Sequence, residues 1–133
     1  MEREIYLIYY PVDKEIHIWL NNGDENKIVS QYDSEIHFKE KIMTIENGEF
    51  FELYNRLAEV NIKEFLDNNG EEDDGAVFDI AFGSFTDRVH FEVKVNKKNM
   101  ERVKKICDVV KKILEIAEID KKEYENDFIG DKQ

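Results

Sequence analysis

Two apolar segments near the start of the chain, residues 4–10 (EIYLIYY) and 15–20 (EIHIWL), flank the four-residue sequence PVDK. Their aromatic and β-branched residues predict two strands, and Pro11 presets the first corner of a turn between them. Closing this hairpin pairs Leu7 with Ile18 and Tyr9 with Ile16. The period of two then gives one face with Ile5, Leu7, Tyr9, Ile16, Ile18 and Leu20, and another with Tyr6, Ile8, Tyr10, His17 and Trp19. Because both faces are apolar, we expect each to be covered by a helix, another sheet or a partner.

The next segments predict two further strands and then a helix. Residues 28–32 and 35–45 have strand character and are expected to join at Asp33 and Ser34. From Asn47 the apolar period becomes helical, with Asn47 as the expected N-cap. One stripe of this helix carries Phe50, Leu53, Tyr54 and Leu57. A short helical continuation is predicted at 62–66.

A second hairpin is predicted on either side of the sequence GSFTD. Pairing Ile80 with Phe91 also aligns Phe82 with Val89 and Phe78 with Val93 on one face. The opposite face carries Asp79, Ala81, Arg88, His90, Glu92 and Lys94. This face is polar, so we expect one side of the hairpin to be partly solvated.

The last predicted element is an amphipathic helix over residues 97–117, with Asn96 as its N-cap and an apolar stripe that runs from Met100 to Ala117. The order β-β-β-β-α-β-β-α, with short connections between strands, predicts an α+β fold. It consists of an antiparallel sheet of about six strands with two main helices packed on it. We expect residues 1–117 to form a single domain and 118–133 a polar C-terminal tail, either frayed or held by Tyr124 and Phe128.

Composition narrows the functional class. The 133 residues contain 19 Lys and Arg against 31 Asp and Glu, a net charge of −12. Such a surface repels nucleic acid and anionic lipid and attracts basic proteins. The chain has one cysteine, Cys107, so an internal disulfide is excluded. This residue lies in the apolar stripe of the last predicted helix. Without an apolar run of membrane-spanning length or a signal-peptide pattern, the expected protein is soluble and cytoplasmic.

The sequence DNNGEEDDG at residues 67–75 concentrates negative charge. Its carboxylates do not match the calcium-binding loop of helix-loop-helix proteins, because the sixth position counted from Asp67 is Glu72 rather than glycine and the twelfth is Phe78. The segment is therefore either a solvated connection or a surface that attracts a basic partner. Its candidate partner-binding residues are Asp67, Glu71, Glu72, Asp73 and Asp74.

No local pattern predicts catalysis, a metal or another cofactor. The histidines at 17, 37 and 90 have no metal-ligand spacing, and the chain has no glycine-rich phosphate loop. The best acid–base candidate is His90 beside Asp79 or Glu92. A solvated cross-strand polar cluster explains the same residues more simply, so we expect no enzyme.

Recognition is the remaining class, and two surfaces could serve it. The first is the acidic segment together with Asp79 and Glu92. The second is the aromatic strand face with Tyr6, Tyr10 and Trp19, which either binds a partner or is covered by a helix. We therefore expect an immunity or inhibitor protein that blocks the active site of a basic bacterial toxin, such as a nuclease. The alternatives are an adaptor or obligate-complex subunit that uses the aromatic face, with a homodimer possible, a DNA mimic, or an enzyme built on His90 and Asp79.

Overall fold

The computed structural model describes residues 2–11, 14–23, 27–34, 38–60, 76–84, 86–95, 101 and 103–124. Six strands form an antiparallel sheet in the order β4-β3-β2-β1-β5-β6. In chain order these strands are β1 Arg3–Tyr9, β2 Lys14–Asn21, β3 Lys27–Ser34, β4 Phe38–Thr44, β5 Ala76–Ser84 and β6 Arg88–Val95. Strand β1 is therefore central, although it comes first along the chain.

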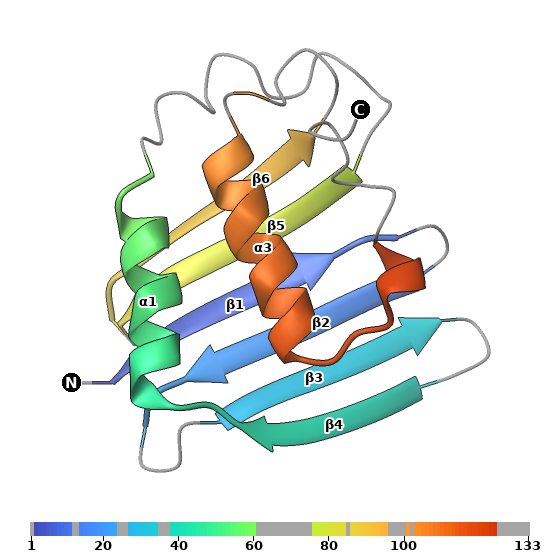
Figure 1. The fold of residues 1–133 in the computed structure, drawn as a ribbon, viewed down its shortest axis with the longest axis horizontal. Coiled ribbons are helices and arrows are strands. Elements are labelled where there is room, and N and C mark those ends of the chain that lie inside the picture. Colours follow the sequence, from blue (N-terminus) through green and yellow to red (C-terminus); the bar gives the residue numbers. More distant parts are fainter. Residues whose placement is uncertain are drawn as a thin grey trace.

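Two helices, α1 (Asn47–Ala58) and α3 (Lys104–Ile116), lie side by side over the same face of this sheet (Figure 1). A short 3-10 helix, η1 (Lys121–Glu123), follows α3. The predicted α+β fold and element order are therefore confirmed. No helix in the described part of the chain combines the length and the apolar character needed to cross a membrane. The predicted continuation at 62–66 and the acidic segment at 67–75 lie outside the described residues.

The predicted registers of both hairpins are confirmed. In the first, Leu7 pairs with Ile18 and Tyr9 with Ile16, and the Lys14 amide donates to the Pro11 carbonyl to close the turn. In the second, Ile80 pairs with Phe91, with the flanking pairs as expected. A slip of one residue would turn every side chain to the other face, and a slip of two would require a different turn, so alternation and the turns together fix these registers.

The hydrophobic core fills the space between the sheet and the two helices. Its strand residues are almost completely shielded from solvent, as are the stripes that the helices turn toward them. The largest helix residues in this core are Phe50, Leu53 and Leu57 from α1 and Ile106, Ile113 and Leu114 from α3. Each fully buried side chain of this size contributes roughly 1.5–3 kcal/mol through removal of apolar surface from water.

Three predicted boundaries are wrong. Asp33 and Ser34 belong to β3 rather than to a turn. The N-cap of α1 is Glu46, so Asn47 is already helical. Helix α3 begins at Lys104 instead of residue 97, although the buried Val103 before it continues the apolar stripe. An apolar period reports which face is buried and not where helical hydrogen bonds begin, which accounts for the late start. The expected cap Asn96 lies outside the described residues.

The first residues of the predicted tail pack against the sheet. Tyr124 is buried in the core, and the Tyr9 hydroxyl donates to the Glu123 carbonyl at 3.2 Å. Lys14 Nζ lies 2.6 Å from Glu123 Oε1. Tyr124 thus holds this segment, as one of the two alternatives expected, whereas Phe128 lies outside the described residues.

Candidate functional site

The sheet face opposite α1 and α3, which we call the open face, is covered by neither of the described helices (Figure 1). Cross-strand pairing aligns one row of side chains across this face, and we call it the aromatic row: Ile42, Val29, Trp19, Tyr6, Ala81 and His90. Trp19 is 38% exposed and Ile42 is 60% exposed. Of the two arrangements expected for the aromatic strand face, helix coverage is therefore wrong for the described helices.

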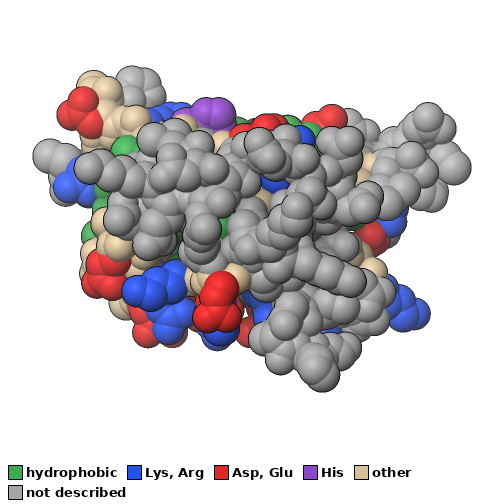
Figure 2. Space-filling view, turned by 90° about the horizontal axis from the view of Figure 1, so that it is seen from above, with side chains coloured by type: hydrophobic (Ala, Val, Ile, Leu, Met, Phe, Trp, Pro, Cys, Tyr) green, Lys and Arg blue, Asp and Glu red, His purple; other side chains and the backbone are tan. Residues whose placement is uncertain are grey.

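The broad faces of the molecule differ in the kinds of side chain they present. Both described histidines, His17 and His90, belong to the open face. In Figure 2 a histidine therefore marks the rim of this face, where hydrophobic and charged side chains lie together. The opposite rim in the same view shows mainly Lys, Arg, Asp and Glu side chains among its described residues. The open face thus combines apolar and charged groups, as protein interfaces do.

A second row, which we call the polar row, lies beside the first and consists of Glu40, Gln31, His17, Ile8, Asp79 and Glu92. Carboxylates stand at both of its ends. Asp79 and Glu92 face each other directly across β5 and β6. The Tyr10 hydroxyl donates to Asp79 Oδ2 at 3.0 Å. Burial, this hydrogen bond and nearby carboxylate charge raise the pKa of Tyr10 to about 12.

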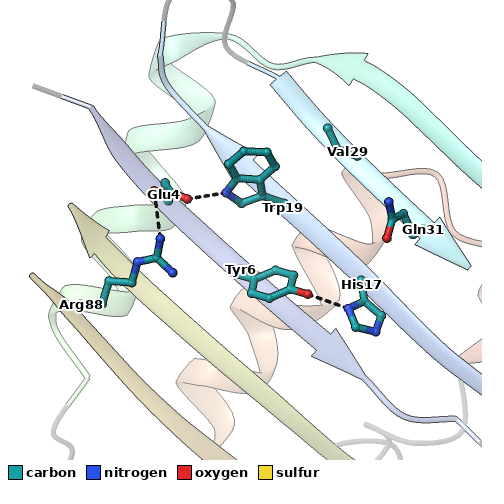
Figure 3. Close-up of a pocket in the computed structure, with 7 residues that line it drawn as sticks. All are labelled: Glu4, Tyr6, His17, Trp19, Val29, Gln31 and Arg88. Atoms are coloured by element: carbon teal, nitrogen blue, oxygen red, sulfur yellow. Dashed lines mark hydrogen bonds and ion pairs between the residues drawn. The ribbon is translucent and has the colours of Figure 1, made fainter. Parts of the chain in front are cut away.

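A groove with a volume of about 330 Å³ lies on the open face, and we call it the Trp19 groove (Figure 3). Strands β1, β2, β3 and β6 all contribute to it. Its lining consists of Glu4, Tyr6, His17, Trp19, Val29, Gln31 and Arg88. A pocket of this size is at the small end of the range for ligand sites, roughly 300–1,000 Å³.

Glu4 anchors one end of the groove. Trp19 Nε1 donates to Glu4 Oε1 at 2.6 Å, and Arg88 Nη2 donates to Glu4 Oε2 at 3.2 Å. The Glu4 side chain is only 11% exposed, so its charge is compensated by these two contacts. The pair fixes the indole and the guanidinium relative to each other.

Gly83 lies between Glu4 and Arg88, at the end of β5 beside the turn to β6. Its position in β5 pairs with Glu4 on one side and with Arg88 on the other. Its φ of 147° lies in a region that favours glycine, and an added Cβ would collide with the Asp87 carbonyl oxygen. Glycine at this position therefore allows the close approach of the turn backbone.

A hydrogen-bonded chain positions the aromatic side chains at the other end of the groove. Tyr6 Oη lies 2.6 Å from His17 Nδ1, and His17 Nε2 lies 2.9 Å from Glu15 Oε1. Burial, and secondarily the charge of Glu15, raise the pKa of Tyr6, so its hydroxyl keeps its proton at neutral pH. Because the ionised Glu15 carboxylate only accepts, Nε2–H donates to it, and in this neutral tautomer Nδ1 accepts from the Tyr6 hydroxyl.

This chain resembles the order of a nucleophile, a base and an orienting carboxylate, but its chemistry favours positioning. A tyrosine whose pKa is raised is a poor nucleophile at neutral pH, because activation requires a lowered pKa or proton removal. The other acid–base candidate has less support, because no hydrogen bond joins His90 to Asp79 within the described structure. The described residues also contain no cluster of three His, Cys, Asp or Glu that could hold a metal ion.

The structure separates the predicted site residues into three groups. Tyr6 and Trp19 line the groove, whereas Tyr10, Asp79 and Glu92 lie at one end of the open face. The five carboxylates of the acidic segment, Asp67, Glu71, Glu72, Asp73 and Asp74, lie outside the described residues.

Sequence reasoning missed several groove residues, above all Glu4 and Arg88. The alternation placed Arg88 on the polar face of its hairpin, but its contact with Glu4 depends on β5 pairing with β1. Gln31 and Val29 were missed because no register was assigned to the third and fourth strands. Alignment of their alternation with the first hairpin would have placed Val29 opposite Trp19 and Gln31 opposite His17.

No protein-family model matches this chain, and no curated protein matches it significantly. Its function is therefore inferred from the chemistry of the open face.

Proposed function

We propose that this protein is an acidic protein-binding module that holds a basic partner on the open face. Its most specific form is an immunity or inhibitor protein that neutralises a basic bacterial toxin, such as a nuclease, by blocking its active site. The observation that carries the proposal is the aromatic row, in which Trp19 and Tyr6 lie on a sheet face that neither described helix covers.

The aromatic row has the properties of an energetic centre in an interface. Tryptophan and tyrosine dominate binding energies when a partner removes them from water. Here the Trp19 indole is fixed by Glu4, and the Tyr6 hydroxyl is fixed by His17. Because these side chains are already ordered, binding costs less conformational entropy than it would for free side chains. The exposed Ile42 extends the same apolar surface toward the edge of the sheet.

Charge favours a basic partner. The chain carries a net charge of −12, and the open face presents the carboxylates of Glu15, Glu40, Asp79 and Glu92. The bases that the register places on the same face are Lys27, Lys94 and Arg88, and Arg88 is paired with Glu4. Such a surface accelerates encounter with a cationic protein, most strongly at low salt.

Inhibition of a nuclease follows from the same chemistry. An enzyme that binds a phosphate backbone needs a cationic cleft. Carboxylates at the ends of the polar row would occupy positions that phosphates take, while the aromatic row would slow dissociation by burying apolar area. This mechanism requires only a rigid face with charge at its rim, and no catalytic group.

The test compares two variants of the tagged protein in a capture experiment from its native cells. Ile42→Asp places a charge on the aromatic row, whereas Phe51→Asp places the same charge on the exposed side of α1, where Phe51 is 36% exposed. We expect one basic protein to be captured by the wild type and the Phe51 variant and to be lost from the Ile42 variant. Purified wild-type protein should then inhibit the activity of the captured protein.

Equal capture by both variants would contradict a role for the open face. Capture of a partner whose activity is unaffected would instead favour the second candidate, an adaptor or obligate-complex subunit that uses the same aromatic row. Sedimentation of the purified chain separates a self-associating form of this candidate, because a stable homodimer would place a second copy on the open face. Thermal unfolding of both variants checks that each one folds.

A further inference from the structure

We infer that the Trp19 groove receives an arginine side chain of the basic partner, with its guanidinium group over the aromatic rings and directed toward Glu15 and Glu40. This inference rests on the proposed function and specifies the chemistry by which the open face recognises its partner.

The rings provide a surface on which a planar cation can stack. Figure 3 shows the ring faces of Trp19 and Tyr6 turned away from the helices, toward the open side of the sheet. Tryptophan is the strongest aromatic partner for a cation. Its position is fixed through Nε1, which donates to Glu4 within the plane of the ring, so the ring face remains available. Val29 adds an apolar contact for the methylene groups of an arginine.

The two ends of the groove differ in net charge, because one holds the Glu4–Arg88 ion pair and the other adjoins two carboxylates, and this difference gives a bound cation a direction. At one end Glu4 is occupied by Trp19 and Arg88, and the Arg88 guanidinium repels a second cation. At the other end, two carboxylates each lie one hydrogen bond from a lining side chain. Glu15 contacts His17 at 2.9 Å, and Glu40 accepts from Gln31 Nε2 at 2.8 Å.

The acceptors at this end suit a guanidinium group. The Glu15 side chain is 55% exposed, and Glu40 is exposed as well, so both remain accessible to a partner. Gln31 donates through its nitrogen to Glu40, which leaves its amide oxygen as a further acceptor. A guanidinium group offers five N–H donors in a plane and is weakly hydrated, whereas a lysine ammonium is compact and strongly hydrated. The groove therefore favours arginine over lysine.

The position of the sole tryptophan allows a direct test. The chain has one tryptophan, so its fluorescence reports on the groove alone. The probe is a capped Gly-Arg-Gly peptide, and its matched control contains citrulline, which has the same shape without the charge. We expect a saturable change in Trp19 fluorescence with the arginine peptide, half-saturated in the millimolar range. Binding of the citrulline peptide should be at least about fivefold weaker, and that of a lysine peptide intermediate.

Matched variants assign the interaction to the predicted end of the groove. The double variant Glu15→Gln with Glu40→Gln should weaken binding of the arginine peptide by about fivefold or more. The control double variant, Glu52→Gln with Glu59→Gln, removes the same charge from exposed positions at α1 and should change binding by less than about twofold. Similar losses in both double variants would reduce the effect to overall charge and overturn the inference.

Other outcomes separate this inference from the proposed function. An arginine peptide that produces no saturable change, or that binds no better than the citrulline peptide, overturns the arginine site. If the captured partner nevertheless protects Trp19 from a soluble quencher such as acrylamide, the open face still binds a protein and the proposed function stands. If the arginine peptide binds but capture is insensitive to Ile42→Asp, the arginine site stands and the proposed function fails.

Discussion

Strand β1 contributes to both faces of the sheet, and its residues differ sharply between the two. Toward the helices it presents Ile5, Leu7 and Tyr9, all completely buried. Toward the open face it presents Glu4 and Tyr6, whose polar atoms are engaged by neighbouring strands. The first set excludes water and holds the helices. The second set is held in place by hydrogen bonds, and neither described helix covers it.

The comparison indicates that the core lies on one face of the sheet, whereas the recognition that we propose would use the opposite face. Substitutions on the helix-covered face are therefore expected to act mainly on folding, and those on the open face mainly on binding. This division also accounts for the absence of unpartnered buried polar side-chain atoms among the described residues, because the polar groups of the open face pair with one another.

The largest expected effect comes from adjacent residues of β1 that point to opposite faces. Leu7→Ala should lower the free energy of unfolding by about 2–5 kcal/mol, because the buried side chain leaves a cavity between the sheet and the helices. Ile8 is half-buried on the open face, so Ile8→Ala should lower the free energy of unfolding by about 1 kcal/mol or less. Urea unfolding measures both values. Equal costs would show that the open face carries as much of the stability as the core.

Smaller changes in stability, of opposite sign, are expected when two glycines are replaced by alanine. Gly83→Ala should cost about 1–3 kcal/mol, since the new Cβ meets backbone at the turn between β5 and β6 and the φ of 147° is unfavourable for alanine. Gly48→Ala in α1 should instead stabilise by up to about 1 kcal/mol, because a Cβ there meets nothing within 4 Å.

Thermal unfolding of the two variants checks the opposite signs. The Gly83 variant should also show altered Trp19 fluorescence, because Glu4 and Arg88 meet across this position. Destabilisation without any fluorescence change would confine the role of Gly83 to the turn.

The smallest effect is a loss of stability at alkaline pH. It separates the two faces because each carries a group that titrates there. Burial raises the pKa of Cys107 on the helix-covered side to about 12, from 9.0. The folded state then holds this proton more tightly than the unfolded state does. This difference contributes to the free energy of unfolding, and the contribution is complete below pH 9. It is lost as pH rises toward 12, and the loss reaches the order of 1 kcal/mol by pH 10.

Tyr10 on the open face should behave likewise over a narrower range. Its pKa is raised from 10.0 to about 12, so its contribution is complete below pH 10 and is lost between pH 10 and 12. Denaturant unfolding from pH 8 to 11 of the wild type, Cys107→Ala and Tyr10→Phe measures the two slopes. Loss of stability that begins at the same pH in the wild type and the Cys107 variant would contradict the assignment to this thiol.

The sequence predicted the local features of the fold because each depends on a short period. The registers at Leu7 and Ile80 follow from alternation together with the position of each turn, and the buried stripes of both helices follow from helical spacing. The strand order could not be predicted in this way. Pairing of β1 with β5 joins segments distant in sequence and depends on the packing of the whole sheet.

The candidate site was predicted only in part for the same reason. Both faces of the first hairpin are apolar, and no local pattern showed which of them the helices cover. The structure places the set that is aliphatic except for Tyr9 under the helices and leaves Tyr6 and Trp19 on the other side, where the hydroxyl and the indole nitrogen find polar partners. Tyrosine and tryptophan at a buried position need such partners, whereas Leu7 and Ile18 do not.

The central position of β1 also has a consequence for the order of events on the ribosome. Strand β1 pairs with β2, which follows it closely, and with β5, which begins about 70 residues later. At a synthesis rate of roughly 5–20 residues per second, the second edge of β1 waits roughly 3–13 s for its partner. During that interval the nascent chain carries an unsatisfied strand edge flanked by apolar side chains. The strand that later lies at the centre of the sheet is thus, for some seconds, a site where a nascent-chain chaperone would bind.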